Sequence, residues 1–274
     1  MNYRHAFHAG NFADVVKHAT YAWTLARLAE KPKPFAALDT HAGLGEYDLD
    51  ADQAARTGEW RTGIGRVRDA LGTAPAALAP YAASLAALDP RFYPGSPRVA
   101  AAHLRAEDRL ILCEKHPADA ETLRRTFAEE TRVEIRADDG YAVLKAALPP
   151  KERRGVVLID PPFEAKDEFA RLAGALRQGL KRFATGTFLV WYPIKDRAGP
   201  DALIGGFADG AVKRVGVCEI EWAQAPDGKG LRGCGMLSVN APWRYEEAMH
   251  EAWGWCADRF PPGAQIRVET VVGE

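Results

Sequence analysis

Short apolar segments that alternate with helical stretches place the strongest constraint on the fold of this 274-residue chain. The apolar segments are residues 35–39, 110–114, 133–135, 156–160 and 187–192. Helical patterns, such as residues 118–130 and 164–182, separate most of them. Nearly continuous apolar strands are typical of parallel sheets that are covered by helices on both faces. We therefore predict an α/β fold around a largely parallel sheet.

Residues 47–108 form a stretch that is too long for a single crossover between two strands. It is rich in alanine and leucine, and turn signals divide it, so it predicts two or three helices inserted after the first strand. Within it, Ser96 is the expected N-cap of a helix that Pro97 opens and that ends near residue 106. Further strands are predicted after residue 200, and we expect them to pair antiparallel; they are residues 215–222, 236–239 and 266–272.

The first eighteen residues carry more polar chemistry than a chain terminus usually does. Residues 3–8 hold two histidines, two aromatic rings and an arginine, ahead of a predicted helix over residues 12–30. Asn11 is its expected N-cap, with Asp14 as a weaker capping-box partner. A charged helix face is usually solvated, so Lys17 and His18 are expected on the polar side of this helix.

The composition says less about the function than the sequence patterns do. The net charge of −1 neither identifies nor excludes a nucleic-acid binder, because a local basic face can exist in a neutral total. The basic runs at residues 151–154 and 181–182 are either phosphate contacts or ordinary surface. The four cysteines (Cys113, Cys218, Cys234 and Cys256) lack the spacing of a zinc site, which fits free thiols in a reducing compartment.

Neither a membrane protein nor a metal-binding protein is expected from this sequence. The chain has no apolar run of about 18 residues, so a membrane span is not predicted. His5 and His8 have no neighbouring cluster of cysteines or acids that would complete a tetrahedral metal site. We expect a cytoplasmic monomer that uses no metal and has no membrane partner.

Acidic residues stand at the ends of the predicted strands. Asp39, Glu114 and Asp160 each end one, and Asp139 follows another within a few residues. Ligands of open α/β sheets bind outside the carboxyl ends of the strands. We therefore expect these four acids to border one ligand site.

The sequence Asp160-Pro161-Pro162-Phe163 is the most informative of these strand ends. Two prolines cannot continue a strand ladder, but their carbonyl groups remain hydrogen-bond acceptors. The Asp160 carboxylate and the Pro161 carbonyl could each accept one N–H of an exocyclic amine, while Phe163 stacks on a flipped base. The alternative is a structural turn with Phe163 in the core.

Residues 39–45, Asp-Thr-His-Ala-Gly-Leu-Gly, form a second strand end at which glycines allow a ligand to approach the backbone. The spacing differs from a dinucleotide-binding motif, since Glu114 follows Asp39 by 75 residues instead of about 20. An acid such as Glu114 could still accept both ribose hydroxyls of a nucleoside cofactor, and Asp139 with Gly140 could meet an adenine amino group. Glu114 as a solvated strand terminus is the alternative.

Together, Asp39-x-x-x-Gly-x-Gly, Glu114, Asp139 and Asp160-Pro-Pro-Phe resemble a class I S-adenosyl-L-methionine-dependent methyltransferase that acts on amines. More closely, the chain resembles the bacterial 23S ribosomal RNA adenine-N6 methyltransferase J family from Tyr3 to about Trp243. The strings that carry this likeness include Tyr3-Arg-His-Ala-Phe-His-Ala-Gly-Asn, Asp14-Val-Val-Lys-His, Tyr93-Pro-Gly-Ser-Pro and Lys181-Arg-Phe-Ala-Thr-Gly-Thr. One departure is Phe163, where the family commonly has tyrosine.

The resemblance implies a Rossmann-like class I methyltransferase domain over residues 1–46 and 109–274, with an inserted helical subdomain over residues 47–108. It implies methylation of the N6 amine of one adenine in 23S ribosomal RNA, with Asp160 as the catalytic residue. The implied contacts to the cofactor, S-adenosyl-L-methionine, are His18, His41, Ser96, Glu114, Asp139, Gly140 and Asp160. The implied or expected substrate contacts are Tyr3, His5, Lys17, Pro161 and Phe163, with the first residues forming a lid over the pocket near Phe163.

Other functions remain open on the sequence. The amine could be guanine N2 in ribosomal RNA, adenine in DNA or a glutamine amide in a protein, although an acid at position 160 favours adenine. A non-catalytic RNA-binding module on a Rossmann scaffold is the alternative from another class, because a fold does not fix a function.

Overall fold

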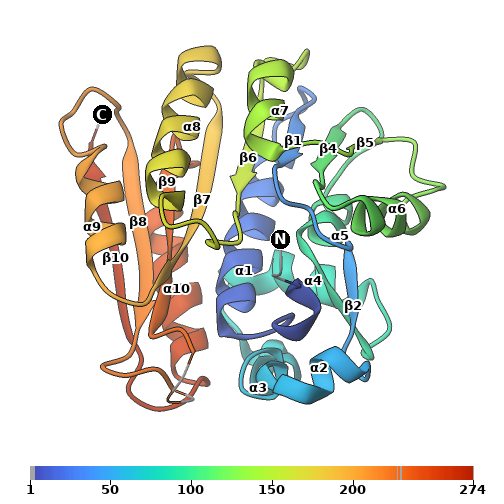
Figure 1. Cartoon of the computed structure of the whole chain (residues 1–274), viewed down its shortest axis with the longest axis vertical. Coiled ribbons are helices and arrows are strands. Elements are labelled where there is room, and N and C mark those ends of the chain that lie inside the picture. The colour runs from blue at the N-terminus through green and yellow to red at the C-terminus, as the bar shows by residue number, and fades with distance from the viewer. Residues whose placement is uncertain (1–3, 227, 229, 274) are drawn as a thin grey trace.

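One eight-stranded sheet forms the centre of the protein in the computed structural model, which describes residues 4–226, 228 and 230–273 (Figure 1). The strand order is β10-β8-β9-β7-β6-β1-β4-β5. The parallel strands are β1 (Ala36–Asp39), β4 (Arg109–Cys113), β5 (Val133–Arg136), β6 (Gly155–Ile159) and β7 (Thr187–Ile194). The antiparallel strands are β8 (Val215–Glu221), β9 (Gly233–Val239) and β10 (Gln265–Val272). The expected Rossmann-like α/β sheet is confirmed, as are the antiparallel strands at its end.

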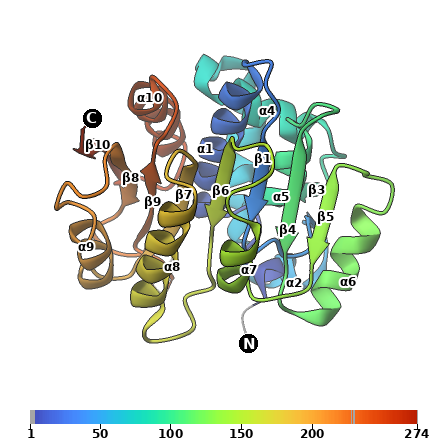
Figure 2. The ribbon, with the colours of Figure 1, turned by 90° about the horizontal axis from the view of Figure 1, so that it is seen from above.

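Helices cover both faces of the sheet because alternate strand residues point to opposite faces (Figure 2). Ala37, Leu110 and Leu158 belong to one hydrophobic core, and Leu38, Ile111 and Val157 belong to the other. The helices of the first core are α1 (Phe12–Ala29), α4 (Ala79–Ala86), α5 (Ser96–Ala101), α6 (Pro117–Thr126) and α10 (Tyr245–Ala257). Those of the second are α7 (Gly140–Ala147), α8 (Glu168–Arg182) and α9 (Ala198–Gly205).

The start of α1 is built largely as the sequence indicates. The Asn11 side chain accepts a hydrogen bond from the backbone N–H of Asp14, at 3.0 Å, and so caps the helix. The Asp14 carboxylate does not close a capping box, however; it accepts from the backbone N–H of Gly10 at 2.9 Å. The helix ends at Ala29, just before the Lys-Pro-Lys-Pro sequence of residues 31–34.

The segment between β1 and β4 is mostly helical, as predicted. Besides α4 and α5 it contains α2 (Asp52–Thr57), α3 (Ile64–Val67) and the short 3-10 helices η2 (Glu59–Arg61), η3 (Arg68–Thr73) and η4 (Ala76–Leu78). It also contains a small sheet that the sequence analysis missed, in which β2 (Glu46–Asp48) pairs with β3 (Phe92–Pro94). The division of the chain into two domains at residues 46 and 109 stays a prediction.

The prediction for Ser96 as a helix cap is wrong. Gly95 occupies the N-cap position of α5, Ser96 is the first helical residue, and the helix ends at Ala101 instead of near residue 106. The basic residues at positions 151–154 and 181–182 come before β6 and β7 in the sequence, so they lie at the amino ends of the parallel strands. The strand-end acids lie at the opposite edge.

Candidate active site

A cavity of about 1200 Å³ opens at the carboxyl ends of the parallel strands. The chain reverses its strand order between β1 and β6, and such a switch point is where open α/β sheets bind ligands. Glu114, Asp139 and Asp160 all line the cavity, so the structure brings these strand-end acids together. The expectation for Asp39 is wrong, because its side chain is fully buried and does not line the cavity. His5, Lys17, His18, His41, Ser96, Gly140, Pro161 and Phe163 line it as well.

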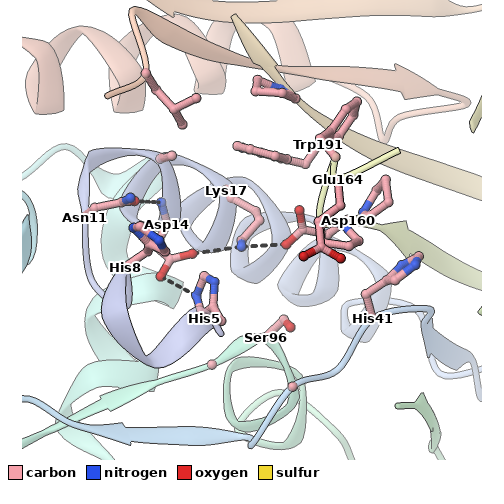
Figure 3. A pocket seen from close by; sticks show the side chains of 18 of the residues that line it. His5, His8, Asn11, Asp14, Lys17, His41, Ser96, Asp160, Glu164 and Trp191 are labelled. Carbon is pink, nitrogen blue, oxygen red and sulfur yellow. Dashed lines mark hydrogen bonds and ion pairs between the residues drawn. The ribbon is translucent and has the colours of Figure 1, made fainter. Parts of the chain in front are cut away.

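Asp160 is held from one side by a lysine of α1. Its carboxylate Oδ2 accepts from Lys17 Nζ at 2.7 Å, and the two side chains point toward one another across the cavity wall (Figure 3). The residues are 143 positions apart in the sequence. The acid at the end of β6 therefore has a fixed orientation that depends on the packing of α1 beneath the sheet.

Lys17 is not on a solvated helix face, contrary to the prediction; it is 4% exposed. Its Nζ lies 2.8 Å from Asp14 Oδ1 in addition to Asp160, and 5.9 Å from the centre of the Trp191 ring. Burial alone would lower its pKa, but the two carboxylates outweigh burial and raise the pKa of Lys17 well above its usual value. The lysine is thus a buried cation between two acids.

Asp14 connects this ion pair to the N-terminal arm. Its Oδ2 lies 2.9 Å from His5 Nε2, and the same oxygen accepts from the Gly10 amide (Figure 3). Burial opposes its ionisation, but the charges of His5 and Lys17 hold the pKa of Asp14 well below its usual value. Sequence reasoning missed this role, although the spacing of three residues between Asp14 and Lys17 places both side chains on one side of the helix.

The Asp-Pro-Pro-Phe sequence forms a tight turn after β6. Phe163 has a φ of +50°, a conformation that costs energy for a residue with a side chain and that is often found at functional sites. Its ring is partly buried and packs against Phe169 and Trp191, with centroids 4.8 and 5.8 Å away. Phe163 therefore both joins the core and borders the cavity. Trp191 is a second aromatic residue of this cavity wall, and no sequence motif predicted it there.

Glu114 is fixed by the backbone instead of being solvated, and it is 7% exposed. Its Oε2 accepts from the Gly43 amide at 2.9 Å and its Oε1 from the His116 amide at 2.7 Å. Burial raises the pKa of Glu114, and these hydrogen bonds oppose the increase. Gly43 and Gly45 have positive φ values of 63° and 87°, which explains why this turn contains glycines.

Asp139 and Gly140 begin α7 at the cavity wall. Asp139 caps the helix through the amides of Tyr141 and Ala142, and its other carboxylate oxygen lies 3.0 Å from Lys115 Nζ. A Cβ atom at Gly140 would lie 2.0 Å from the carbonyl oxygen of Thr40. The glycine is therefore required for the close approach of α7 to the end of β1.

The two histidines that are predicted to contact the cofactor, His18 and His41, lie in buried surroundings. His18 is 1% exposed, not solvated as expected, and its Nδ1 lies 2.9 Å from the Tyr93 hydroxyl. Burial lowers the pKa of His18 to about 3. The Nδ1 of His41 lies 2.8 Å from the Thr40 hydroxyl, and burial lowers the pKa of His41 to about 4. Both rings are therefore neutral near pH 7.

Ser96 borders the cavity beside the buried Asp39. Burial raises the pKa of Asp39 to about 6, although a hydrogen bond with Ser96 opposes the increase. Asp39 Oδ1 accepts from the His41 amide at 3.1 Å. Asp39 thus stabilises the turn after β1 from below, while Ser96 and His41 face the cavity.

The described part of the arm is tied to its surroundings. Arg4 forms an ion pair with Asp119 of α6 at 3.2 Å, and His8 Nδ1 lies 2.9 Å from Glu59. His5 packs edge-on against Tyr47. Tyr3 lies outside the described residues. The contacts of Arg4, His5 and His8 therefore join the arm to α1, α6 and the inserted segment, and the predicted lid near Phe163 stays a prediction.

Neither a metal cluster nor a membrane-spanning helix is present in the described ranges. No group of three or more His, Cys, Asp or Glu residues that could hold a metal ion was found there. Within the same ranges, no helix has the length and apolarity needed to cross a membrane. The four cysteines are free and buried. The expected cytoplasmic location and monomeric state stay predictions.

Comparison with known proteins identifies the family. The family model described as "Ribosomal RNA large subunit methyltransferase D, RlmJ" matches residues 32–272. The chain belongs to the RlmJ family. Two proteins named "Ribosomal RNA large subunit methyltransferase J" are similar to it: that of Haemophilus influenzae is 41% identical, covering 92% of this chain and 91% of the relative, and that of Escherichia coli is 40% identical, covering 96% and 95%.

Two solved structures are similar to this chain in fold. The crystal structure of protein LPL1258 from Legionella pneumophila is 31% identical, covers 96% of this chain and 98% of its own, and superposes with a TM-score of 0.89. A protein from Corynebacterium glutamicum described as a probable spermidine synthase is 13% identical, with a TM-score of 0.54 and coverage of 94% and 75%. This second likeness shows the fold alone.

Proposed function

We propose that this RlmJ-family chain transfers a methyl group from S-adenosyl-L-methionine to the exocyclic N6 amine of one adenine in 23S ribosomal RNA. The observation that carries the proposal is the Asp160 carboxylate, fixed by Lys17 at 2.7 Å in the same cavity as Glu114 and Asp139. The names of its curated relatives support ribosomal RNA as the substrate. The Asp-Pro-Pro-Phe sequence resembles the motif of methyltransferases that act on amines, which supports the adenine amine as the methyl acceptor.

The cavity wall fits the cofactor. Glu114 is held by two backbone amides and retains lone pairs that can accept from ribose hydroxyls. The neighbouring Gly140 has no side chain because the backbone of Thr40 approaches it closely. We assign the cofactor contacts to His18, His41, Ser96, Glu114, Asp139, Gly140 and Asp160. When bound, S-adenosyl-L-methionine supplies an electrophilic methyl group on a sulfonium.

The protein's part in methyl transfer is to position the amine. The lone pair of an aromatic amine is delocalised into the ring, so acceptors on both N–H groups favour a nucleophilic geometry. Lys17 occupies Asp160 Oδ2, and we assign Oδ1 and the Pro161 carbonyl to the two N–H groups of the substrate. As nitrogen gains the methyl group it loses a proton, for which the Asp160 carboxylate is the acceptor. Positioning of this kind can supply several kcal/mol of the barrier reduction.

The remaining substrate contacts follow from the walls of the cavity. We assign base stacking to Phe163, an interaction worth about 1–3 kcal/mol in nucleic-acid sites. Lys17 acts by holding Asp160, so it is a positioning residue. His5 and the adjoining Tyr3 belong to the arm, which we propose covers the RNA-binding side of the cavity while His5 stays anchored on Asp14.

The test combines substrate mapping with one variant. Labelled S-adenosyl-L-methionine is incubated with unmodified total RNA, DNA and protein in parallel, and the label is expected on one adenine of 23S ribosomal RNA. Asp160→Ala should leave cofactor binding measurable, because the other cofactor contacts remain, but lose at least about a hundredfold in turnover, in the range of a lost transition-state contact. Asp167→Ala, an exposed acid further along the same loop, is the control and should keep activity. Label on DNA or protein, or an active Asp160→Ala variant, would contradict the proposal.

A further inference from the structure

The cavity itself is poorly suited to attract RNA. Eight carboxylate residues border it, against four lysines and arginines, among the lining residues that the structure describes. A nucleic-acid backbone carries one negative charge per phosphate, and its binding depends mainly on lysine and arginine contacts. The cations that hold the RNA near the cavity must therefore lie on its rim.

Three exposed arginines stand on the inserted segment beside the cavity. Arg56 lies in the last turn of α2, Arg61 ends η2 and Arg66 lies in α3; we call them the arginine rim. The rim adjoins the cavity directly, since Glu59 and Thr62 of the same segment line it. In the view of Figure 1, α2 and α3 lie below the N-terminal segment.

The acids near the rim do not use its guanidinium donors. Glu59 is engaged instead by the N-terminal region, through His8 Nδ1 at 2.9 Å and Asn11 Nδ2 at 3.0 Å. In the described part of the chain, neither Asp52 nor Asp69 forms an ion pair with the rim, and none of the three arginines has an ion pair with any other acid. These donors remain available for an anionic partner.

The rim is rigidly attached to the helix that carries Asp14 and Lys17. The Ile64 amide donates to the Gly10 carbonyl at 2.9 Å. A Cβ atom at Gly63 would lie 2.2 Å from that same carbonyl oxygen, so the two backbones are in direct contact. The Thr57 hydroxyl donates to the Phe7 carbonyl. A phosphate bound at the rim would consequently have a fixed position relative to the catalytic end of α1.

Arg61 is oriented before any partner binds. Its guanidinium lies over the Trp60 ring, 5.2 Å from the ring centre, and beside Gly58, whose φ of +63° turns the chain at that point. A planar guanidinium that is stacked on an aromatic ring loses little entropy when it forms paired hydrogen bonds with phosphate. This geometry suits a phosphate contact better than that of a freely rotating side chain.

We propose that the arginine rim binds the phosphates of the ribosomal RNA strand beside the target adenine. The proposal rests on the proposed function for the identity of the RNA. It assigns to the inserted segment the task of holding the substrate backbone, while the cavity holds the base. Phosphate contacts fix the register of a nucleic acid without reading its sequence.

The experiment compares two sets of three neutralised cations. Arg56→Gln, Arg61→Gln and Arg66→Gln are combined in one variant, and Lys151→Gln, Lys181→Gln and Arg182→Gln, at the opposite edge of the sheet, in the control. Binding of an in vitro transcribed 23S ribosomal RNA fragment is measured at several salt concentrations, alongside binding of S-adenosyl-L-methionine and turnover. If the triple rim variant is unstable, Arg56→Gln with Arg66→Gln alone keeps Arg61 and its tryptophan contact.

The rim variant should raise the Kd for the RNA at least about tenfold and reduce the slope of log K against log salt by about 2–3. Its KM for RNA should rise while kcat at saturating RNA and cofactor binding stay close to wild type. An RNA affinity and salt slope equal to those of the control would overturn the rim proposal alone, provided that the wild type methylates RNA. A wild type that binds RNA through the rim but transfers no methyl group would overturn the proposed function alone, and no RNA binding at all would overturn both.

Discussion

Three side chains near the start of the molecule form a connected series of contacts that leads to Asp160, the proposed catalytic acid. His5, Asp14, Lys17 and Asp160 follow one another at 2.9, 2.8 and 2.7 Å. A buried ion pair contributes little net stability over an apolar replacement, but removing one partner from it is costly. These contacts therefore matter mainly because they position Asp160, since they connect the N-terminal arm to the acid at the end of β6.

Substituting Asp14 tests that positioning role. Asp14→Asn keeps an acceptor oxygen but removes the charge that holds both His5 and Lys17. We expect kcat to fall at least about tenfold, because Asp160 loses its fixed orientation, and the free energy of unfolding to fall by about 2 kcal/mol. Single-turnover methyl transfer, cofactor titration and thermal unfolding measure these effects separately.

Glu59→Gln is the matched control for Asp14→Asn. It weakens a histidine contact of the same arm, also at 2.9 Å, without touching Lys17. Its kcat should stay within about threefold of wild type. Equal losses in the two variants would indicate that any loosening of the arm reduces transfer, and that Asp14 has no separate positioning role.

At the scale of elements, the cavity depends on how closely α7 approaches the end of β1. The first residue of α7 is Gly140, and the carbonyl of Thr40 fills the space that a side chain would need. Asp139, which precedes it, can face the cavity and cap the helix only while α7 keeps this position. The cofactor contacts proposed for Asp139 and Gly140 therefore depend on this backbone packing.

Gly140→Ala should therefore weaken cofactor binding. A Cβ atom 2.0 Å from a backbone oxygen forces the helix and strand apart, and overpacking of this kind costs about 1–3 kcal/mol. We expect a lower Tm and a Kd for S-adenosyl-L-methionine at least about tenfold higher, measured by calorimetry. Gly174→Ala, in the interior of α8 with open space around its Cβ, should instead raise the stability by up to about 1 kcal/mol. An unchanged cofactor Kd in Gly140→Ala would show that the helix start tolerates displacement.

At the scale of the whole molecule, the buried His18 and His41 make the protein less stable in mild acid. Burial lowers the pKa of His18 to about 3 and that of His41 to about 4, from 6.5. Below pH 6.5 the unfolded chain therefore binds protons that the folded protein does not, so stability falls as the pH decreases. Asp39 acts in the opposite direction, because its raised pKa of about 6 lets the folded protein bind a proton first, and it offsets part of the loss.

Replacing His18 should reduce this acid sensitivity. Between pH 7 and pH 5, the difference between its pKa in the folded and unfolded states lowers the free energy of unfolding by about 2 kcal/mol. Over this pH range, the free energy of unfolding of His18→Gln, measured by denaturant titration, should therefore fall by about 2 kcal/mol less than that of the wild type. Tyr93→Phe keeps the histidine but removes its hydroxyl partner, so it should be less stable at both pH values and retain most of the pH dependence. Parallel pH profiles for wild type and His18→Gln would contradict this account.

Both the architecture and the position of the cavity could be predicted from the amino-acid sequence. Local patterns specify both: the apolar segments predicted the five parallel strands, and parallel strands necessarily present their terminal acids at one edge. The Asp-Pro-Pro-Phe turn, the glycine turn after Asp39 and the family resemblance pointed to the site for the same reason, since each is a short motif. Boundaries were less accurate, as with α5, where Gly95 and not Ser96 is the cap.

The contacts made by the side chains of the first helix, in contrast, could not be predicted without the fold. The sequence predicted Lys17 and His18 on a solvated face because charged residues are usually exposed, but α1 is buried on nearly all sides and both residues are inside. Their partners, Asp160 and Tyr93, are 143 and 75 residues away. No local pattern encodes such pairings, because burial and contact over long sequence separations depend on the packing of the complete fold.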